Sequence, residues 1–139
     1  MGAQTSKSMT IGRLAGQANV GIDTVRFYER RGLLPEPART PAGYRLYPPD
    51  VIARLQFIRR AKALGFSLDE IKTMLRLQDA GGSKSEVKEL TIHKLEEIEA
   101  KIADLSRMRK VLKKLASECS GTGEIEGCPI IEALSLDDR

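Results

Sequence analysis

The sequence predicts a mainly α-helical protein: a small helical head with a two-stranded wing, then one long helix, then a loop and a short terminal helix. Apolar residues recur at helical spacing through most of the 139 residues. A stretch rich in proline and glycine, residues 33–49, interrupts the helices once. From residue 85 to 117, a charged segment with a regular apolar stripe follows without a break.

Two short helices around a tight turn open the head. Thr10 is a suitable N-cap for a helix that Asn19-Val20-Gly21 ends. A second helix is expected from Ile22 to Arg31, and Gly32 terminates it. The pair is typical of a helix-turn-helix, although an ordinary helical hairpin has the same pattern.

The proline-rich stretch predicts a wing beside these helices. Residues 43–47 alternate in type after a Pro-Ala-Gly turn, as in a small antiparallel pair. Arg39, Tyr44 and Arg45 lie where a wing offers guanidinium and phenol groups to a phosphate backbone. At least one of Tyr44 and Tyr47 is expected to pack under the loop instead.

Two more helices complete the head. The apolar pattern predicts the first over residues 50–64. Ser67 and Glu70 then have the spacing of a capping box, which starts a second helix that runs to Leu77. Two adjacent glycines further on predict a hinge.

The segment 85–117 carries the longest apolar stripe of the chain. Steps of three and four residues separate its members, as in a coiled coil: Val87, Thr91, Leu95, Ile98, Ile102, Leu105, Met108 or Arg109, Leu112 and Leu115. No other segment is long enough to cover this stripe, so the expected partner is the same helix of a second copy. A helix folded back over the head would leave half of the stripe in water.

Charge is divided unevenly along a chain whose formal net charge is +4. Residues 1–66 carry 11 Lys and Arg against 4 Asp and Glu, whereas residues 67–139 carry 12 against 15. A basic head favours a nucleic-acid partner, although a membrane surface or a solvated face fits the same numbers. No apolar run reaches the roughly 18 residues of a bilayer-spanning helix, and the N-terminus is polar, so we expect a cytoplasmic protein that makes no membrane contact.

The loop after the long helix contains the two cysteines of the sequence, Cys119 and Cys128. Three glycines let the loop curl back, and Pro129 suits the first turn of a terminal helix whose dipole favours a thiolate. Two thiolates suit a linear soft ion such as Cu(I), Ag(I), Au(I) or Hg(II), whereas zinc needs four ligands that only His93 and carboxylates could complete. A redox pair and two inert thiols remain open on the spacing alone.

An enzyme is not expected. The single histidine, His93, lies within the long helix, and the sequence has no glycine-rich phosphate loop or nucleophile motif. The competing class is an interaction module built on the coiled coil without metal response. Such a module would show no salt-dependent DNA binding, whereas a DNA-binding regulator would show a steep salt slope.

Several motifs together resemble the MerR family of transcriptional regulators over about residues 9–134. The head motifs are Ile11-Gly12-Arg13-Leu14-Ala15, Thr24-Val25-Arg26-Phe27-Tyr28-Glu29, Gly32-Leu33-Leu34, Gly43-Tyr44-Arg45-Leu46-Tyr47 and Gly65-Phe66-Ser67-Leu68. Cys119 and the run Cys128-Pro129-Ile130-Ile131 resemble the metal-binding loop of the family's metal-sensing branch.

The resemblance implies a homodimer on double-stranded promoter DNA, with the second helix of each head in a major groove, the wing beside it, and an antiparallel coiled coil between the copies. The implied DNA contacts are Arg13, Thr24, Arg26, Tyr28, Arg39, Tyr44 and Arg45. The effector then makes the dimer bend and untwist the promoter spacer for RNA polymerase. The implied order is a disordered tail (1–8), a DNA-binding head (9–77), a hinge (78–84), a dimerisation helix (85–117), a metal-binding loop and helix (118–134) and a tail (135–139).

The resemblance also bears on the effector. Divalent-metal sensors of this family usually have a third cysteine, from the other subunit, near the start of the long helix, where this chain has Ser83 or Lys84. We therefore expect Cu(I), Ag(I) or Au(I) at Cys119 and Cys128, with Hg(II) or another soft divalent ion (Pb, Cd or Zn) as the alternative. A monovalent ion between two thiolates leaves one negative charge, which Lys84 could balance unless it only lies in solvent at the helix start. Drug-sensing members of the family have an added C-terminal ligand domain, and iron–sulfur members have four cysteines where this chain has two. We therefore expect neither a drug sensor nor an iron–sulfur sensor.

Overall fold

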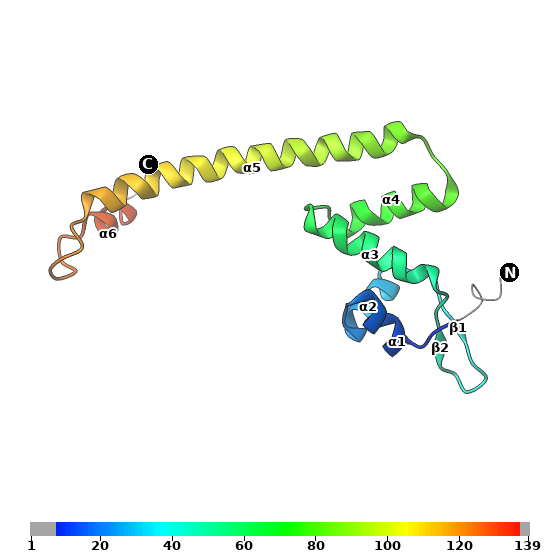
Figure 1. Cartoon of the computed structure of the whole chain (residues 1–139). Helices are drawn as coiled ribbons and strands as arrows, with labels where there is room; N and C mark the ends of the chain where they lie inside the picture. Colours follow the sequence, from blue (N-terminus) through cyan, green and yellow to red (C-terminus); the bar gives the residue numbers. More distant parts are fainter. Residues whose placement is uncertain (1–7, 137–139) are drawn as a thin grey trace. The chain divides into compact units, whose positions relative to one another are not determined.

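The computed structural model describes residues 8–136 and divides into two compact units, one up to residue 90 and one from residue 91 onward. The first unit holds the winged head (Figure 1), whose elements are α1 (Ile11–Ala18), α2 (Ile22–Arg30), β1 (Ala38–Arg39), β2 (Arg45–Leu46), α3 (Asp50–Ala63) and α4 (Leu68–Ala80). The long helix α5 (Lys84–Glu118) begins in this unit and continues into the second, which also holds α6 (Pro129–Leu134). The predicted fold class is confirmed. The predicted tails lie mostly outside the described residues.

The helix-turn-helix is built as its sequence indicates. The Thr10 hydroxyl accepts a hydrogen bond from the Arg13 amide at 3.4 Å and caps α1, whose end is marked by Asn19 in a left-handed conformation at φ 59°. Asparagine tolerates this conformation better than most residues, so the helix ends without glycine. α2 ends at Arg30, one residue before the predicted end. α1 packs against both α2 and α3.

The wing is a two-stranded antiparallel ribbon in which Ala38 pairs with Leu46 and Arg39 with Arg45. Beyond β2, Tyr47 forms an isolated bridge with Met9, and the two residues exchange backbone hydrogen bonds of 2.8 and 2.9 Å. Tyr47 is 1% exposed, whereas Tyr44 at the ribbon turn is 70% exposed. The expectation that one wing tyrosine packs inside is therefore confirmed.

One apolar core holds the head together. Its most deeply buried side chains come from all four head helices and the segments between them: Leu14, Val25, Leu33, Tyr47, Leu55, Ile58, Ile71 and Leu75. The members on helices follow the helical period of each helix, and Leu33 and Tyr47 come from the connecting segments, so one core joins the helix-turn-helix to the α3–α4 pair.

The predicted hinge at 78–84 is shorter in the structure. α4 continues to Ala80, three residues past the predicted end, and α5 starts at Lys84. Arg54 on α3 explains the difference, because its guanidinium holds Asp79 through two hydrogen bonds of 3.0 and 2.8 Å and so anchors the last turn of α4. The same contact lowers the pKa of the Asp79 carboxyl.

The capping box at the start of α4 provides a test of local stability. The Ser67 hydroxyl accepts the Glu70 amide at 3.1 Å, and the Glu70 carboxylate accepts the Ser67 amide at 2.7 Å. We expect Ser67→Ala to lower the free energy of unfolding by about 1 kcal/mol, because the Glu70 amide loses its acceptor. Urea denaturation followed by circular dichroism measures this, with the exposed Ser135→Ala as a control; an unchanged midpoint would contradict it.

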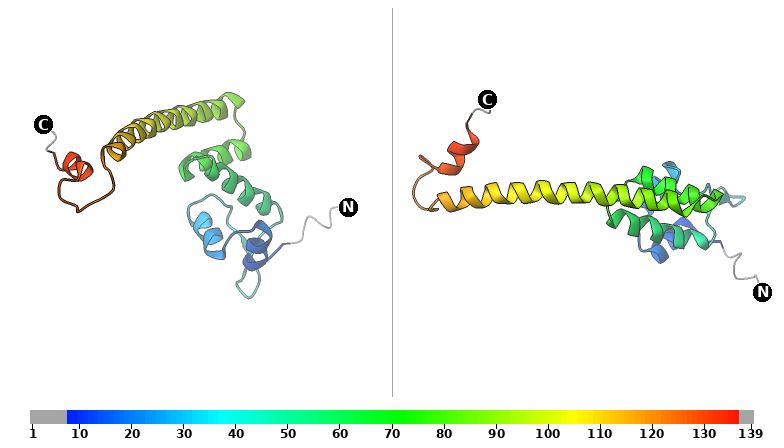
Figure 2. Two further views of the ribbon diagram at one scale, coloured as in Figure 1. Left: turned by 60° about the vertical axis from the view of Figure 1, so that its left-hand side comes forward. Right: turned by 90° about the horizontal axis from the view of Figure 1, so that it is seen from above.

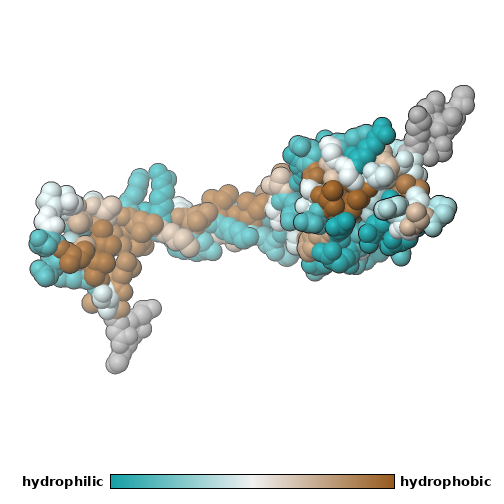
Figure 3. Space-filling view, turned by 90° about the horizontal axis from the view of Figure 1, so that it is seen from below, coloured by the Kyte–Doolittle hydropathy of each residue, from teal (hydrophilic) through white to brown (hydrophobic). Residues whose placement is uncertain are grey.

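The second unit holds most of α5, whose large apolar side chains are mostly exposed in the part of the chain that the structure describes. α5 runs without interruption in both views of Figure 2, one residue longer at each end than predicted. Apolar side chains gather along it and around the C-terminal segment in Figure 3. The exposed large apolar residues of α5 are Val87, Ile92, Leu95, Ile102, Leu105, Met108, Val111 and Leu112. Within α5, Leu115 alone is buried.

Candidate nucleic-acid interface and thiol site

α2 presents a polar and basic face to solvent. Arg26 is exposed and lies 3.9 Å from Asp23 on the preceding turn, while Thr24 is half-buried on the same turn. The Arg31 guanidinium, one residue beyond α2, lies over the Phe27 ring at 5.6 Å from its centroid. The predicted contact residues Thr24 and Arg26 are thus available at the surface.

Tyr28 does not lie on this face. It is 7% exposed, belongs to the core cluster and packs beside Phe27 at 5.8 Å between ring centroids. Burial raises the pKa of its phenol. The Tyr28 ring thus lies with Val25, three residues before it, on the buried side of α2, as helical spacing requires. Its predicted DNA contact stays a prediction.

The wing and α1 place the remaining predicted residues at the surface. Arg13 is exposed in the first turn of α1. Arg39 is exposed and donates to the Gly43 carbonyl at 2.9 Å, which ties it to the turn of its own ribbon. Tyr44 is exposed at that turn, where its backbone amide donates to the Thr40 hydroxyl at 3.0 Å.

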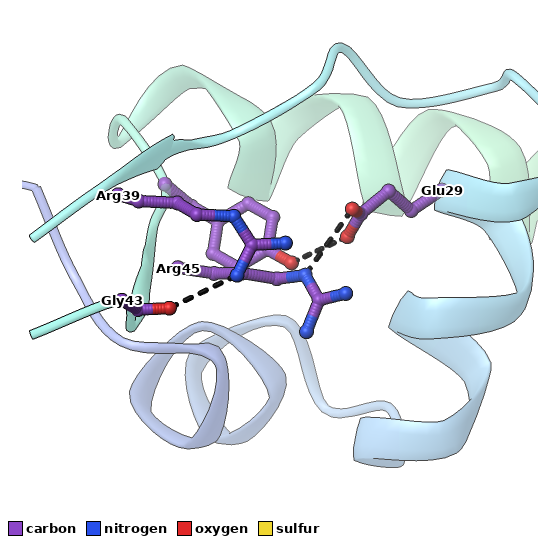
Figure 4. A network of polar contacts seen from close by, with 5 residues as sticks. Glu29, Arg39, Gly43 and Arg45 are labelled. Atoms are coloured by element: carbon purple, nitrogen blue, oxygen red, sulfur yellow. Dashed lines mark hydrogen bonds and ion pairs between the residues drawn. The ribbon is translucent and has the colours of Figure 1, made fainter.

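Arg45 belongs to a network that the sequence did not reveal (Figure 4). Its Nε donates to Glu29 Oε2 at 3.3 Å, and the Tyr47 hydroxyl donates to Glu29 Oε1 at 2.6 Å. Burial, with the hydrogen bond to Glu29 and the charge of that carboxylate, raises the pKa of Tyr47 to about 12. Sequence reasoning overlooked Glu29 because an acidic residue is not an expected phosphate ligand and its partners are 16 and 18 positions away.

The cysteine loop brings its two thiols together. The loop of residues 119–128 turns back on itself with Gly121, Gly123 and Gly127 at positive φ, so Cys119 at the end of α5 lies beside Cys128 at the start of α6. A hollow of about 640 Å³ is lined by residues 118–129. Both thiols are free and partly buried.

The surroundings of Cys128 favour its thiolate. Hydrogen bonding from the Ile131 amide, then from the Ile130 amide and the Cys119 thiol, lowers the pKa of Cys128, although Cys128 makes no regular N-cap hydrogen bond. Partial burial and the nearby Glu132 carboxylate oppose this effect. The predicted effect of the α6 N-terminus on the Cys128 thiolate thus comes from the amides of Ile130 and Ile131.

A lowered pKa predicts that Cys128 reacts at lower pH in the folded chain than in the unfolded chain. Below its ordinary pKa a thiol is mostly protonated, so a lowered value means that more nucleophilic thiolate is present there. We expect the pH midpoint of Cys128 alkylation to be lower in the folded Cys119→Ser variant, whose hydroxyl can still donate, than in the same variant unfolded in urea. Iodoacetamide kinetics measure both; equal midpoints would contradict the assignment.

The two residues expected beside the metal lie at the start of α5. The Ser83 amide donates to the Glu86 carboxylate at 3.2 Å and its hydroxyl lies 2.7 Å from the Ser85 hydroxyl, so Ser83 helps to cap the helix. Lys84 is exposed at the first helical position, where the helix dipole gives a cation no stabilisation. Among residues 8–136, no group of three or more His, Cys, Asp and Glu side chains is arranged to hold a metal ion.

The head combines two helices around a tight turn with a wing that carries exposed arginines, which defines the class of winged helix-turn-helix DNA-binding proteins. A family model described as "MerR HTH family regulatory protein" matches residues 9–78, and one described as "MerR, DNA binding" matches residues 52–115. The chain belongs to the MerR family of transcriptional regulators. In the part of the chain described, no helix has both the length and the apolar character to cross a membrane.

Mercuric resistance regulators and other HTH-type transcriptional regulators are among the relatives. The mercuric resistance operon regulatory protein of Bacillus cereus is 44% identical over 89% of this chain and 95% of its own length. The regulator ZntR of Escherichia coli K12 is 40% identical over 89% and 90%. The family membership inferred from the motifs is thus confirmed across most of both chains.

Solved structures agree with the fold. The regulator PbrR691 of Ralstonia metallidurans CH34, in complex with lead(II), has a TM-score of 0.84 at 37% identity and covers 91% of this chain and 99% of its own. HiNmlR, a MerR family regulator lacking the sensor domain and bound to promoter DNA, has a TM-score of 0.57 at 25% identity and covers 80% and 85%.

Proposed function

We propose that this chain is a cytoplasmic, metal-responsive regulator that binds promoter DNA as a homodimer. It activates transcription by RNA polymerase through DNA distortion when a soft, thiophilic ion binds Cys119 and Cys128. The observation that carries this proposal is the pair of adjacent thiols at the end of the long helix, one of them with a lowered pKa. Soft monovalent ions prefer two thiolates, and Hg(II) accepts the same set.

The uncovered stripe on α5 supports the dimer. Its apolar side chains, Leu105 at 62% exposure among them, would remain in water in a single copy. A second α5 that runs antiparallel would cover them and bring two heads onto one DNA duplex. Two heads on adjacent half-sites then bind with the avidity that a single head lacks.

The exposed residues of the head support a DNA contact surface. We assign contacts to Arg13 on α1, to Thr24 and Arg26 on α2, and to the wing residues Arg39, Tyr44 and Arg45. Arginine pairs with phosphate through two donors at once, and α2 offers side chains to base edges in the major groove. A metal-biased equilibrium between two dimer shapes then acts on the promoter through the energy of DNA deformation.

Two effectors are consistent with the thiol pair. Cu(I), Ag(I) or Au(I) is favoured because Ser83 or Lys84 of the other subunit stands where divalent-metal sensors have a third thiol. A cation at Lys84 of that subunit would balance the negative bis-thiolate complex. Hg(II) is favoured by the B. cereus relative, whose name assigns it to mercuric resistance. A neutral Hg(II) bis-thiolate complex requires no balancing cation, so the two candidates differ in what they require of Lys84.

That difference gives the test. We expect Lys84→Ala to weaken Cu(I) binding by about tenfold in competition with a chelator, and to leave Hg(II) binding unchanged. Lys88→Ala, one turn further along the same helix, is the matched control. If the wild-type protein retains Hg(II) but not Cu(I) in the presence of a competing thiol, Hg(II) replaces Cu(I) as the proposed effector. If neither ion is retained, the metal part of the proposal is wrong.

DNA binding by the wild-type protein distinguishes a DNA-binding regulator from a coiled-coil interaction module without metal response. A regulator that contacts several phosphates loses DNA affinity steeply as salt rises, whereas a module that uses only its coiled coil shows no such dependence. Fluorescence anisotropy with a duplex selected in vitro against the wild-type protein measures the slope.

A further inference from the structure

We propose that Glu29 is a positioning residue for DNA binding, which transmits the rigid placement of buried Tyr47 to the wing guanidinium of Arg45 and thereby fixes that guanidinium relative to α2. The inference rests on the proposed DNA contact of Arg45. It concerns two residues, Glu29 and Tyr47, that do not themselves contact DNA in the proposed function.

Tyr47 is the fixed end of this chain of contacts. Its ring is fully enclosed by the core, and its backbone is held on both sides by the exchange of hydrogen bonds with Met9. The hydroxyl donates to Glu29 at 2.6 Å, a distance typical of a hydrogen bond to a charged acceptor. The core therefore determines where this carboxylate lies.

Glu29 is the middle member. It lies in the last turn of α2, and its side chain is 16% exposed. With one oxygen bound to Tyr47, the other accepts from Arg45 Nε at 3.3 Å. The carboxylate thus joins the helix that carries Thr24 and Arg26 to the second strand of the wing.

Because Arg45 donates to Glu29 through Nε, its two terminal nitrogens lie outside this contact (Figure 4). The two terminal nitrogens can donate to one phosphate in a bidentate contact. The carboxylate therefore restrains the guanidinium without occupying its terminal donors, and the Arg45 side chain remains 34% exposed. A restrained arginine loses less conformational entropy when it binds phosphate.

Glu29 also resolves a repulsion inside the wing. Arg39 and Arg45 are direct partners across the ribbon, and like charges in that position are destabilising. Arg39 is held by the Gly43 carbonyl and Arg45 by Glu29, so the two guanidiniums have different anchors. The acidic residue thus serves the basic surface although its own charge opposes that of DNA.

Nuclear magnetic resonance tests the first half of the inference without DNA. The Arg45 Nε–H signal, identified by its loss in Arg45→Lys, should exchange slowly with water in the full-length wild-type protein. Exchange should be faster in Glu29→Gln and in Tyr47→Phe, but unchanged in Tyr28→Phe, which makes the same substitution at a core tyrosine outside the network. An exchange rate that is the same in all four proteins would overturn the proposal.

A double-mutant cycle tests the second half with the selected duplex. We expect Tyr47→Phe to weaken DNA binding roughly fivefold in the wild-type background and to have no further effect in the Arg45→Ala background. Equal effects in both backgrounds would show that Tyr47 acts only on stability, and would overturn the proposal. Thermal melting of each variant separates loss of folded protein from loss of affinity.

The charge of Glu29 provides an independent readout. Glu29→Gln removes a negative charge from the DNA-binding surface, so affinity for random-sequence DNA should rise while affinity for the selected duplex falls. A stability defect alone would lower both. Arg45→Ala should lower the salt slope by about one. If it changes neither the affinity nor the slope, the Arg45 contact in the proposed function is wrong. The hydrogen exchange of Arg45 Nε–H in the wild-type protein then still reports whether Glu29 holds the side chain.

Discussion

Replacing either Cys119 or Cys128 by serine is expected to weaken binding of the soft ion by roughly a thousandfold or more and to abolish the transcriptional response. A serine hydroxyl is a hard oxygen donor that remains protonated near neutral pH, so it replaces neither the softness nor the charge of a thiolate. With two thiols in the loop and no third strong ligand grouped with them among residues 8–136, one substitution leaves a single thiolate.

Three measurements check this expectation. Chelator competition with Cu(I) and Hg(II) gives the affinities, anisotropy gives DNA binding by the metal-free variant, and in vitro transcription gives the response. DNA binding should persist, because the cysteines lie in the second unit and the wing and α2 lie in the first. Ser120→Ala is the matched control, since it changes a loop hydroxyl that contacts Thr122 and leaves both thiols. Stoichiometric tight binding by either cysteine variant would contradict the proposed site.

A charged residue in the middle of the α5 stripe is expected to separate the dimer. Leu105 is 62% exposed in one copy, and the proposed partner helix would bury it. Leu105→Glu removes this burial in both copies, at a cost of about 2 kcal/mol each, so the dissociation constant should rise roughly a thousandfold. A carboxylate buried in a dry seam without a cationic partner adds to the effect.

Sedimentation equilibrium measures the dimer directly, and the salt-dependent anisotropy assay measures its consequence for DNA binding. Ala100→Glu introduces the same side chain at an exposed position five residues earlier, off the apolar stripe, and should leave the dimer intact. The head should retain its fold in both variants, because its core is built from residues 9–75. A Leu105→Glu protein that sediments as wild type would place the dimer contact elsewhere.

Local sequence patterns were sufficient to predict the helices and several of their starts. The Thr10 cap and the Ser67–Glu70 capping box are hydrogen bonds between residues three positions apart. α6 starts at Pro129 because the fixed φ of proline suits the first position of a helix. Such contacts depend on the backbone of a single helix, so a one-dimensional pattern contains them. The family, too, could be recognised from motifs that are contiguous in the chain.

Features that depend on contacts between distant segments could not be predicted in this way. α4 extends past Leu77 because Arg54, 25 positions before Asp79, holds its last turn. Tyr28 lies in a motif that suggested a DNA contact, yet the packing of α2 against the core decides which side of the helix faces inward.

The sequence by itself therefore determined the helical plan, the wing, the family and the pair of thiols, since each is encoded in short-range periodicity, turn residues or contiguous motifs. Only the tertiary structure decided that an acidic residue on α2 holds the wing arginine and that Arg54 on α3 anchors the last turn of α4. The physical reason is that hydrogen bonding and desolvation depend on distances of a few ångströms between groups whose separation in sequence carries no information about their separation in space.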